Sequence, residues 1–288
     1  MIRHDDFELL RGIVKSRSGL TLSPDKAYLL ENRLMAVARK WGMNDIDGLA
    51  AAVRSGPNEE LLREITEAMT TNETLFFRDQ SPFEQLQKVV LPRLMASRKE
   101  ARHIRIWSAG CSSGQEPYSI SMILREQSAL FKDWRIDILA TDISRTMLDK
   151  ARAGLYTQFE VQRGLPIAML MKHFKQAGDK WELDPSIRAM VEFREFNLLG
   201  DPGTLGRFDI VFLRNVLIYL DQPTKAQVLE KVCRQMPTDG VLYMGGAETV
   251  MGVTEKFQPV SEHRGMYRVT AGGPSQWKTP PASFASNA

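Results

Sequence analysis

Apolar residues recur every three or four positions along the first 70 residues, which is the spacing of amphipathic helices. We expect helices over residues 5–17, 27–41, 46–55 and 59–69. For the second helix, Ser23 and Pro24 are the expected N-cap and first helical residue, and Gly42 is the expected stop. Residues 1–80 therefore predict a small all-helical unit that ends in a hinge.

The pattern changes beyond residue 81, where short β-rich runs alternate with helical patterns. The runs cover residues 104–107, 136–139, 208–212 and 240–244. Alternation of this kind predicts an α/β fold with a doubly wound parallel sheet, here over residues 81–270.

The stretch between the second and third of these runs is longer than one crossover helix requires. Two shorter runs within it, 180–183 and 190–194, flank the turn-forming pair Asp184-Pro185 and predict a β-hairpin. We therefore expect a small antiparallel β subdomain inserted at about residues 155–195.

Composition places the chain among ordinary globular proteins. It has 288 residues, of which 43% are hydrophobic and 25% charged, and this length suggests two domains. No apolar run approaches the ~18 residues of a membrane span, and the N-terminus lacks the apolar core of a signal peptide, so we expect a cytoplasmic protein. Residues 271–288 are rich in Gly, Pro, Ser and Ala, which predicts a disordered tail.

Several kinds of binding site receive no support. Cys111 and Cys233 form neither a CxxC pair nor a cluster with histidines, so we expect no metal site and assign Cys111 a structural role. The net charge of +3 is too small to predict nucleic-acid binding or membrane association.

Charge is nevertheless uneven near the N-terminus. Residues 11–40 carry seven Lys or Arg against two Asp or Glu, whereas residues 41–79 carry three against eight. Arg33, Arg39 and Lys40 fall on the helix face opposite the apolar stripe of residues 27–41. This basic face suits an anionic partner, and a merely solvated face is the alternative.

Two features point to a nucleoside-type ligand. The first β-run leads into the small-residue turn Ser108-Ala-Gly-Cys-Ser-Ser-Gly114, which would let a ligand approach the backbone, although a tight turn without a ligand remains open. Asp142 ends the second run, where an acidic residue can accept hydrogen bonds from ribose hydroxyls; a helix N-cap is the alternative. The turn lacks the Walker lysine, which disfavours nucleoside triphosphate hydrolysis.

Two more segments carry polar residues to the same region. Arg214, Asn215 and Tyr219 follow the third β-run and should lie at the same sheet edge. Residues 70–79 form a polar and aromatic hinge, which could equally be a linker anchored by Phe76 and Phe77.

These residues together resemble a known family. Six blocks match in the family's order: NETLFFRD, AGCSSGQEPYS, ATDIS, FNLL, RNVLIY and PTDGVLYMGGAE. The chain therefore resembles the bacterial chemotaxis receptor methyltransferases, the CheR family, over about residues 5–270. The resemblance implies a Rossmann-like domain that uses S-adenosylmethionine to esterify glutamate side chains on chemoreceptor helices, releasing S-adenosylhomocysteine.

The resemblance also implies residue roles. Those expected to bind the cofactor are Asn72, Thr74, Arg78, Glu116, Asp142, Asn197, Leu198, Arg214 and Asn215. Arg78 and Tyr219 are expected nearest the transferred methyl group. The helical unit would present Arg33, Arg39 and Lys40 to the receptor.

Further expectations concern partners. The enzyme would be recruited from the cytoplasm to membrane receptor arrays, without inserting into the membrane. Family members that bind a tethering peptide at the receptor's C-terminus share a glycine-rich turn in the insert, whereas this chain has Gln176-Ala-Gly-Asp179, so we expect no tethering.

Two other readings remain. One is a methyltransferase that acts on a small molecule or nucleic acid, which is disfavoured because Pro-Pro-Tyr and Pro-Cys motifs are absent. The other is a noncatalytic receptor-binding module, which would not need to retain Asn72, Arg78, Asp142 and Tyr219 together.

Overall fold

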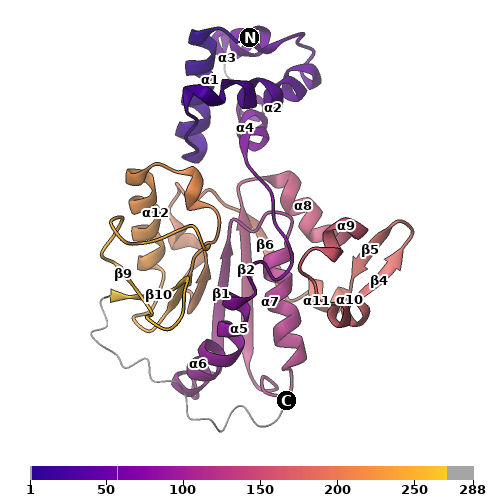
Figure 1. Cartoon of the computed structure of the whole chain (residues 1–288), viewed down its shortest axis with the longest axis vertical. Coiled ribbons are helices and arrows are strands. Elements are labelled where there is room, and N and C mark those ends of the chain that lie inside the picture. The colour runs from indigo at the N-terminus through magenta and orange to yellow at the C-terminus, as the bar shows by residue number, and fades with distance from the viewer. Residues whose placement is uncertain (1, 57, 271–288) are drawn as a thin grey trace.

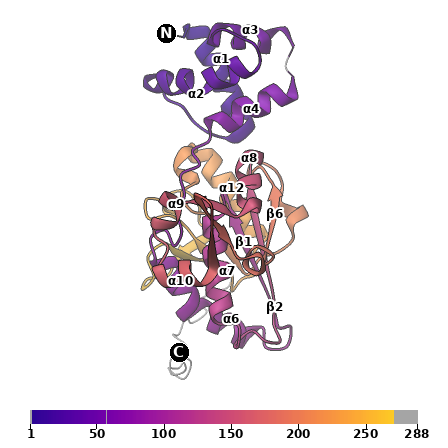
Figure 2. The same cartoon turned by 90° about the vertical axis from the view of Figure 1, so that its right-hand side faces the viewer.

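The computed structural model describes residues 2–56 and 58–270, which form two lobes along the long axis of the molecule (Figures 1 and 2). The smaller lobe consists of α1 (His4–Ser18), the 3-10 turn η1 (Pro24–Lys26), α2 (Ala27–Lys40), α3 (Ile46–Ser55) and α4 (Glu59–Met69). The prediction of an all-helical N-terminal unit is thus confirmed. The predicted tail, residues 271–288, lies outside the described residues.

The start of the second helix differs from the prediction. Ser23 and Pro24 begin the turn η1 instead of α2, and the Ser23 side chain caps neither element. The stop is as predicted, because α2 ends at Lys40 and Gly42 follows with a φ of +74°. Leu30, Leu34 and Val37 are buried in the core of the lobe.

The larger lobe is built on a seven-stranded sheet in the order β6-β2-β1-β7-β8-β10-β9. Its strands are β1 (His103–Ala109), β2 (Arg135–Asp142), β6 (Val191–Glu195), β7 (Ile210–Phe212), β8 (Val241–Tyr243), β9 (Phe257–Pro259) and β10 (Met266–Val269). The first five are parallel, whereas β10 pairs antiparallel with both β8 and β9. The predicted doubly wound sheet is therefore confirmed, with an antiparallel edge added.

Helices cover both faces of this sheet. The helical segments are α5 (Ser81–Gln85), the π-helical turn η2 (Leu86–Val90), α6 (Leu91–Ser97), α7 (Gln115–Glu126), α8 (Arg145–Ala153), the 3-10 turns η3 (Pro202–Leu205) and η4 (Leu217–Tyr219), and α12 (Gln222–Arg234). Ile104 and Ile106 of β1 pack with α5 to α7, whereas Trp107 and Ala109 pack with α12. This alternation follows from the pleat of a strand that is buried on both faces.

The insert lies to one side of the sheet, at the right in Figure 1. It comprises β3 (Leu155–Thr157), α9 (Gln158–Gln162), α10 (Ile167–His173), β4 (Phe174–Ala177), β5 (Lys180–Leu183) and α11 (Pro185–Arg188). The three strands form a small antiparallel sheet in the order β3-β5-β4, which confirms an antiparallel insert.

The predicted hairpin within the insert is wrong. β5 pairs with β4 and β3, whereas residues 191–195 form β6 and pair parallel with β2 in the main sheet. Asp184 caps α11 between them by accepting a hydrogen bond from the Ser186 N–H (2.7 Å). The Asp-Pro pair therefore starts a helical turn, and the chain returns to the main sheet.

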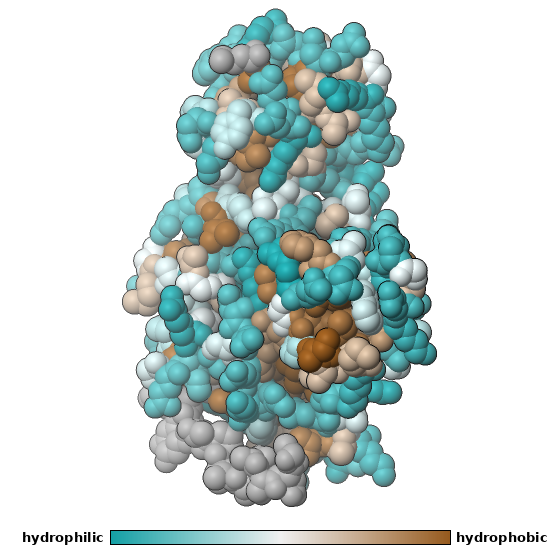
Figure 3. All heavy atoms as spheres, turned by 45° about the vertical axis from the view of Figure 1, so that its right-hand side comes forward, coloured by the Kyte–Doolittle hydropathy of each residue, from teal (hydrophilic) through white to brown (hydrophobic). Residues whose placement is uncertain are grey.

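The two lobes meet at a narrow waist, which Figure 3 shows between a smaller and a larger body. Lys15 pairs with Asp221 (2.8 Å), and the Thr21 N–H donates to the carbonyl of Tyr219 (2.9 Å). The Lys15 ammonium is the main reason that the pKa of Asp221 falls to about 2. The segment that carries Tyr219, one of the expected site residues, is thus bonded to the smaller lobe as well as to its own.

The surface in Figure 3 is mostly hydrophilic, with an apolar area on the larger lobe. Large apolar side chains of α9 and α10 are exposed, among them Phe159, Ile167 and Met171. No helix among the described residues is long and apolar enough to cross a bilayer.

Candidate active site

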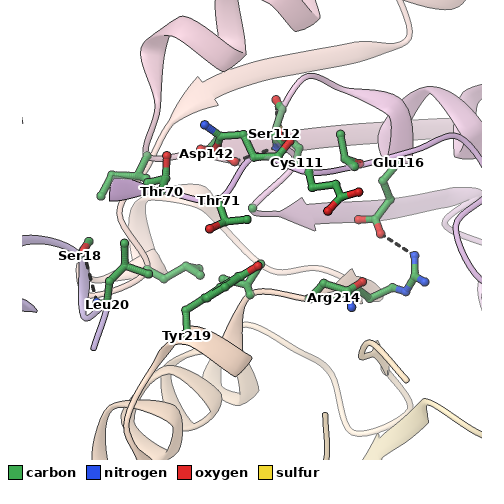
Figure 4. Close-up of a pocket in the computed structure, with 18 of the residues that line it drawn as sticks. Ser18, Leu20, Thr70, Thr71, Cys111, Ser112, Glu116, Asp142, Arg214 and Tyr219 are labelled. Atoms are coloured by element: carbon green, nitrogen blue, oxygen red, sulfur yellow. Dashed lines mark hydrogen bonds and ion pairs between the residues drawn. The ribbon is translucent and has the colours of Figure 1, made fainter. Parts of the chain in front are cut away.

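A pocket lies at the carboxyl ends of the parallel strands, where the strand order reverses between β1 and β7 (Figure 4). Ligands of open α/β sheets bind at such a position. Its lining includes all ten residues predicted for the cofactor and the reaction: Asn72, Thr74, Arg78, Glu116, Asp142, Asn197, Leu198, Arg214, Asn215 and Tyr219. The structure brings these residues together, and their roles toward a ligand stay predictions.

Asp142 ends β2 with its carboxylate buried. Its Oδ2 accepts from the Ser112 N–H (2.7 Å) and its Oδ1 from the Ser144 N–H (2.9 Å). Burial raises the pKa of Asp142, because desolvation outweighs these hydrogen bonds. Each oxygen keeps acceptor capacity for a ligand hydroxyl. The alternative of an N-cap is wrong, since Ser144 caps α8 through the Met147 N–H.

The small-residue turn after β1 forms one wall of the pocket, and its backbone packs closely against Val216. Gly110 has a φ of +78°, and a Cβ there would lie 2.5 Å from Cγ2 of Val216. Ser112 also has a positive φ (49°), which a non-glycine residue adopts at a cost. This conformation turns its N–H toward Asp142, while its hydroxyl donates to the Asn72 carbonyl (2.8 Å).

Glu116 and Arg214 form an ion pair on one side of the pocket (Figure 4). Glu116 accepts from Arg214 Nη1 (2.9 Å) and from the Ser108 hydroxyl (2.8 Å). Arg214 Nη2 also donates to Asp79 and to the carbonyl of Arg78, both at 2.8 Å. Its buried Nε has no hydrogen-bond partner among the described residues. Arg214 therefore connects the hinge to the sheet and keeps its Nε–H unused.

The hinge is both an anchor and a wall of the pocket. Phe76 and Phe77 are buried in the sheet core, as the linker alternative predicts. Asn72, Thr74 and Arg78 nevertheless line the pocket. Both interpretations of residues 70–79 are therefore correct, because the aromatic side chains and the polar side chains point to different places.

Arg78 and Tyr219 make fewer interactions within the protein than Arg214 does. Arg78 donates to the Glu73 carbonyl (3.2 Å), and no described acidic side chain forms an ion pair with it. The Tyr219 hydroxyl has no hydrogen-bond partner within the described part of the chain, and its ring extends into the pocket (Figure 4). Both groups are thus available to a substrate.

The helical unit supplies lining that sequence reasoning missed. Ser18 at the end of α1 and Leu20 just after it line the pocket together with Thr70 and Thr71. The Asn197 side-chain amide donates to the Arg17 carbonyl and accepts from the Leu199 N–H (3.0 Å). No local pattern in α1 could reveal this, because the contact joins residues 180 positions apart.

The three basic residues of α2 differ in their surroundings. Arg33 donates to the carbonyls of Met69 (2.7 Å) and Thr70 (3.0 Å) and to the Thr71 hydroxyl (3.2 Å). Lys40 pairs with Glu64 (2.8 Å), whereas Arg39 is exposed and pairs with no acidic side chain that the structure describes. Arg33 thus satisfies carbonyls at the end of α4 beside the pocket.

Other candidates fall outside the site chemistry. Cys111 lines the pocket, but burial raises the pKa of its thiol well above the usual value. Both cysteines are free. Within residues 2–56 and 58–270, His, Cys, Asp and Glu side chains form no group of three that could hold a metal ion.

The sheet order and the acidic end of β2 beside a small-residue turn are typical of a doubly wound α/β domain that binds a nucleoside-type ligand at its switch point. Residues 72–266 match the family model described as CheR methyltransferase, SAM binding domain, and residues 5–70 match CheR methyltransferase, all-alpha domain. The chain belongs to the CheR methyltransferase family.

Curated relatives agree over nearly their whole length. The chain is 39% identical over 259 residues to Chemotaxis protein methyltransferase Cher2 of Pseudomonas putida, covering 88% of this chain and 94% of the relative. It is 39% identical over 260 residues to Chemotaxis protein methyltransferase 1 of Pseudomonas aeruginosa, with coverages of 88% and 94%. For Chemotaxis protein methyltransferase 1 of Vibrio cholerae the identity is 38% over 252 residues, with coverages of 86% and 90%.

A remote likeness exists to a solved structure of PKMT2 from Rickettsia typhi in complex with AdoHcy. It covers 61% of this chain and 26% of that one, at 12% identity and a TM-score of 0.36.

The pocket residues fit the expected methyl donor. Asp142 has unused acceptor sites for a ribose diol, and Glu116 offers a carboxylate to an ammonium group. The unpartnered Nε of Arg214 is a donor suited to a carboxylate.

Proposed function

We propose that this protein methyl-esterifies glutamate side chains on the cytoplasmic helices of chemoreceptors, with S-adenosylhomocysteine as the second product. The observation that carries the proposal is the uncommitted pair Arg78 and Tyr219 in the same pocket as Asp142 and Glu116. A cation and a hydroxyl donor there suit an acceptor that is already an anion.

The reaction makes modest demands on the protein. Bound S-adenosylmethionine supplies an electrophilic methyl group on a sulfonium centre. A glutamate carboxylate is ionised at neutral pH, so its attack needs neither a general base nor a covalent enzyme intermediate. Accordingly, the described lining of the pocket contains no histidine.

The main task of the side chains is alignment. Arg78 and Tyr219 would hold the acceptor carboxylate in line with the methyl–sulfur bond, and such orientation supplies about 7–11 kcal/mol in well-aligned model reactions. Arg78 should orient the carboxylate without pairing too strongly, because tight ground-state pairing would not lower the barrier.

Receptor recognition is assigned to the helical unit. Arg39 is exposed on α2, and Lys40 is exposed beside Glu64. A receptor helix that carries several glutamates is anionic, so these charges would steer and orient it. The contacts of Arg33 support a role at the hinge more than a direct contact with the receptor.

No tethering peptide is expected to be required. The turn between β4 and β5 contains one glycine, Gly178, with a φ of +63°. The proposal is that the enzyme works in the cytoplasm and reaches receptor arrays through the receptor helices themselves. Equal methylation rates for receptor fragments with and without their last residues would support this.

The test is transfer of labelled methyl from S-adenosylmethionine to a soluble chemoreceptor cytoplasmic fragment. We expect base-labile label on glutamate, reduced at least 100-fold in Arg78→Ala and at least 10-fold in Tyr219→Phe. Arg234→Ala is the matched control, because Arg234 is exposed on α12 and, among the described residues, pairs only with Glu230 in the same helix. It should transfer methyl like the wild type.

Other outcomes would identify another function. Binding of the cofactor without transfer to any of several receptor fragments would favour a noncatalytic receptor-binding module. Base-stable label, or label on a small molecule or nucleic acid, would show a different acceptor and refute the proposal.

A further inference from the structure

Glu248 is a buried acidic residue outside the pocket lining, in the loop that follows β8. Its carboxylate accepts hydrogen bonds from five backbone N–H groups. Oε2 accepts from Asn215 and Gly245, both at 2.7 Å. Oε1 accepts from Val216 (3.0 Å), Leu217 (2.7 Å) and Ile218 (3.3 Å). No described cationic side chain forms an ion pair with it.

Four of these amides belong to one short segment, residues 215–218. It leads from β7 into the 3-10 turn η4, whose first N–H groups have no partner within the turn itself. Asn215 is in the left-handed region with a φ of +59°. Asparagine is one of the few non-glycine residues that adopt this conformation readily, and Glu248 is the group that bonds to its N–H.

The same segment carries residues of the candidate site. Asn215, Val216 and Tyr219 line the pocket, and Arg214 precedes them. The loop of Glu248 also touches the Asn215 side chain, because a Cβ on Gly245 would lie 2.6 Å from Asn215 Nδ2. One carboxylate therefore bonds to the backbone of this wall and also to Gly245, which lies against the Asn215 side chain.

We infer that Glu248 is a positioning residue for this wall of the pocket. It directs Asn215 toward the cofactor and Tyr219 toward the acceptor while touching neither ligand. The part that concerns Tyr219 rests on the proposed function, whereas the part that concerns cofactor binding does not.

Glu248→Gln and Glu248→Ala test this with S-adenosylhomocysteine titration, methyl transfer and thermal denaturation. A glutamine keeps the length of the side chain, but its amide group would face N–H donors. We expect at least a 10-fold loss of S-adenosylhomocysteine affinity in both variants and a larger loss of kcat. Glu255→Gln, an exposed residue of the same connection, should behave like the wild type.

Two readouts separate positioning from a loss of stability. Val228→Ala removes buried volume from α12, and it should lower the Tm while leaving S-adenosylhomocysteine affinity unchanged. Acetate matches the atoms that Glu248→Ala removes, so 50–200 mM acetate should restore part of the affinity of that variant, while equal chloride should not.

The inference is overturned if Glu248→Gln binds S-adenosylhomocysteine within threefold of the wild type, or if Val228→Ala loses affinity to the same degree at the same Tm. If the alanine variant does not fold, the glutamine variant decides. Because the titration needs no receptor, a failure of the proposed acceptor leaves this test intact.

Discussion

Asp142→Asn isolates the charge that the pocket is expected to offer to a ribose diol. Hydrogen bonds to a charged acceptor contribute about 1.5–3 kcal/mol, against about 0.5–1.5 kcal/mol for neutral pairs. The two hydrogen bonds from the ribose hydroxyls would therefore contribute about 2–3 kcal/mol less binding free energy in the variant. This corresponds to a Kd for S-adenosylhomocysteine roughly 30- to 150-fold higher. The shape of the side chain is unchanged, so packing should not contribute.

The unliganded protein should hardly change in stability. The variant forfeits one of the two acceptors that serve Ser112 and Ser144, which costs about 1 kcal/mol. Loss of the buried charge offsets this, because burial raises the pKa of Asp142 and the ionised form therefore costs folding free energy at neutral pH. We expect the Tm of the unliganded variant to stay within about 3 °C of the wild type.

The assay is calorimetric titration with S-adenosylhomocysteine from pH 4 to 8, beside thermal denaturation. A raised folded pKa means that this group's contribution to folding stability is greatest below its unfolded pKa and is lost as pH rises through the folded value. Affinity for S-adenosylhomocysteine depends on pH in the opposite sense. In the wild type it should weaken as the pH falls and Asp142 becomes protonated, whereas the variant should show no such weakening. Equal affinity of the two proteins at pH 7 would refute the assignment.

Three further predictions concern contacts around the pocket. Arg33→Ala should lower the Tm and weaken S-adenosylhomocysteine binding several-fold, whereas Arg39→Ala should change neither and raise only the KM for the receptor fragment, more at low salt. Gly110→Ala should cost about 2 kcal/mol or more by denaturant unfolding and reduce affinity over 10-fold, because its methyl would overlap Val216. Arg214→Lys should weaken binding about 10-fold by titration, since an ammonium cannot reproduce three planar contacts.

Features with local causes could be predicted from the sequence. The helices of the first lobe follow from apolar spacing, and the strands β1, β2, β7 and β8 follow from short runs of β-branched and aromatic residues. Asp142 and the turn around Gly110 were found for the same reason. Each is read from its place at the end of a strand, where the chain itself puts it at the carboxyl edge of the sheet.

Features that depend on distant partners could not be predicted. Residues 191–195 look like a partner for the preceding strand, and only the pairing with β2 shows that they complete the main sheet. Likewise Glu248 lies in one of the recognised blocks, yet its importance depends on amides some 30 positions earlier. A sequence pattern shows that a segment will form a strand or that a residue is acidic, but it does not show which distant groups that segment or residue will contact.

The site depends on both lobes. Arg33 bonds to the hinge residues that line the pocket, the Thr21 N–H bonds to the Tyr219 carbonyl, and the Asn197 amide bonds to the end of α1. The helical unit that is proposed to meet the receptor is therefore connected by a few hydrogen bonds to three walls of the pocket. A receptor helix that shifted this unit would change these bonds, and by linkage any effect on cofactor affinity would be matched by an equal effect of the cofactor on receptor affinity.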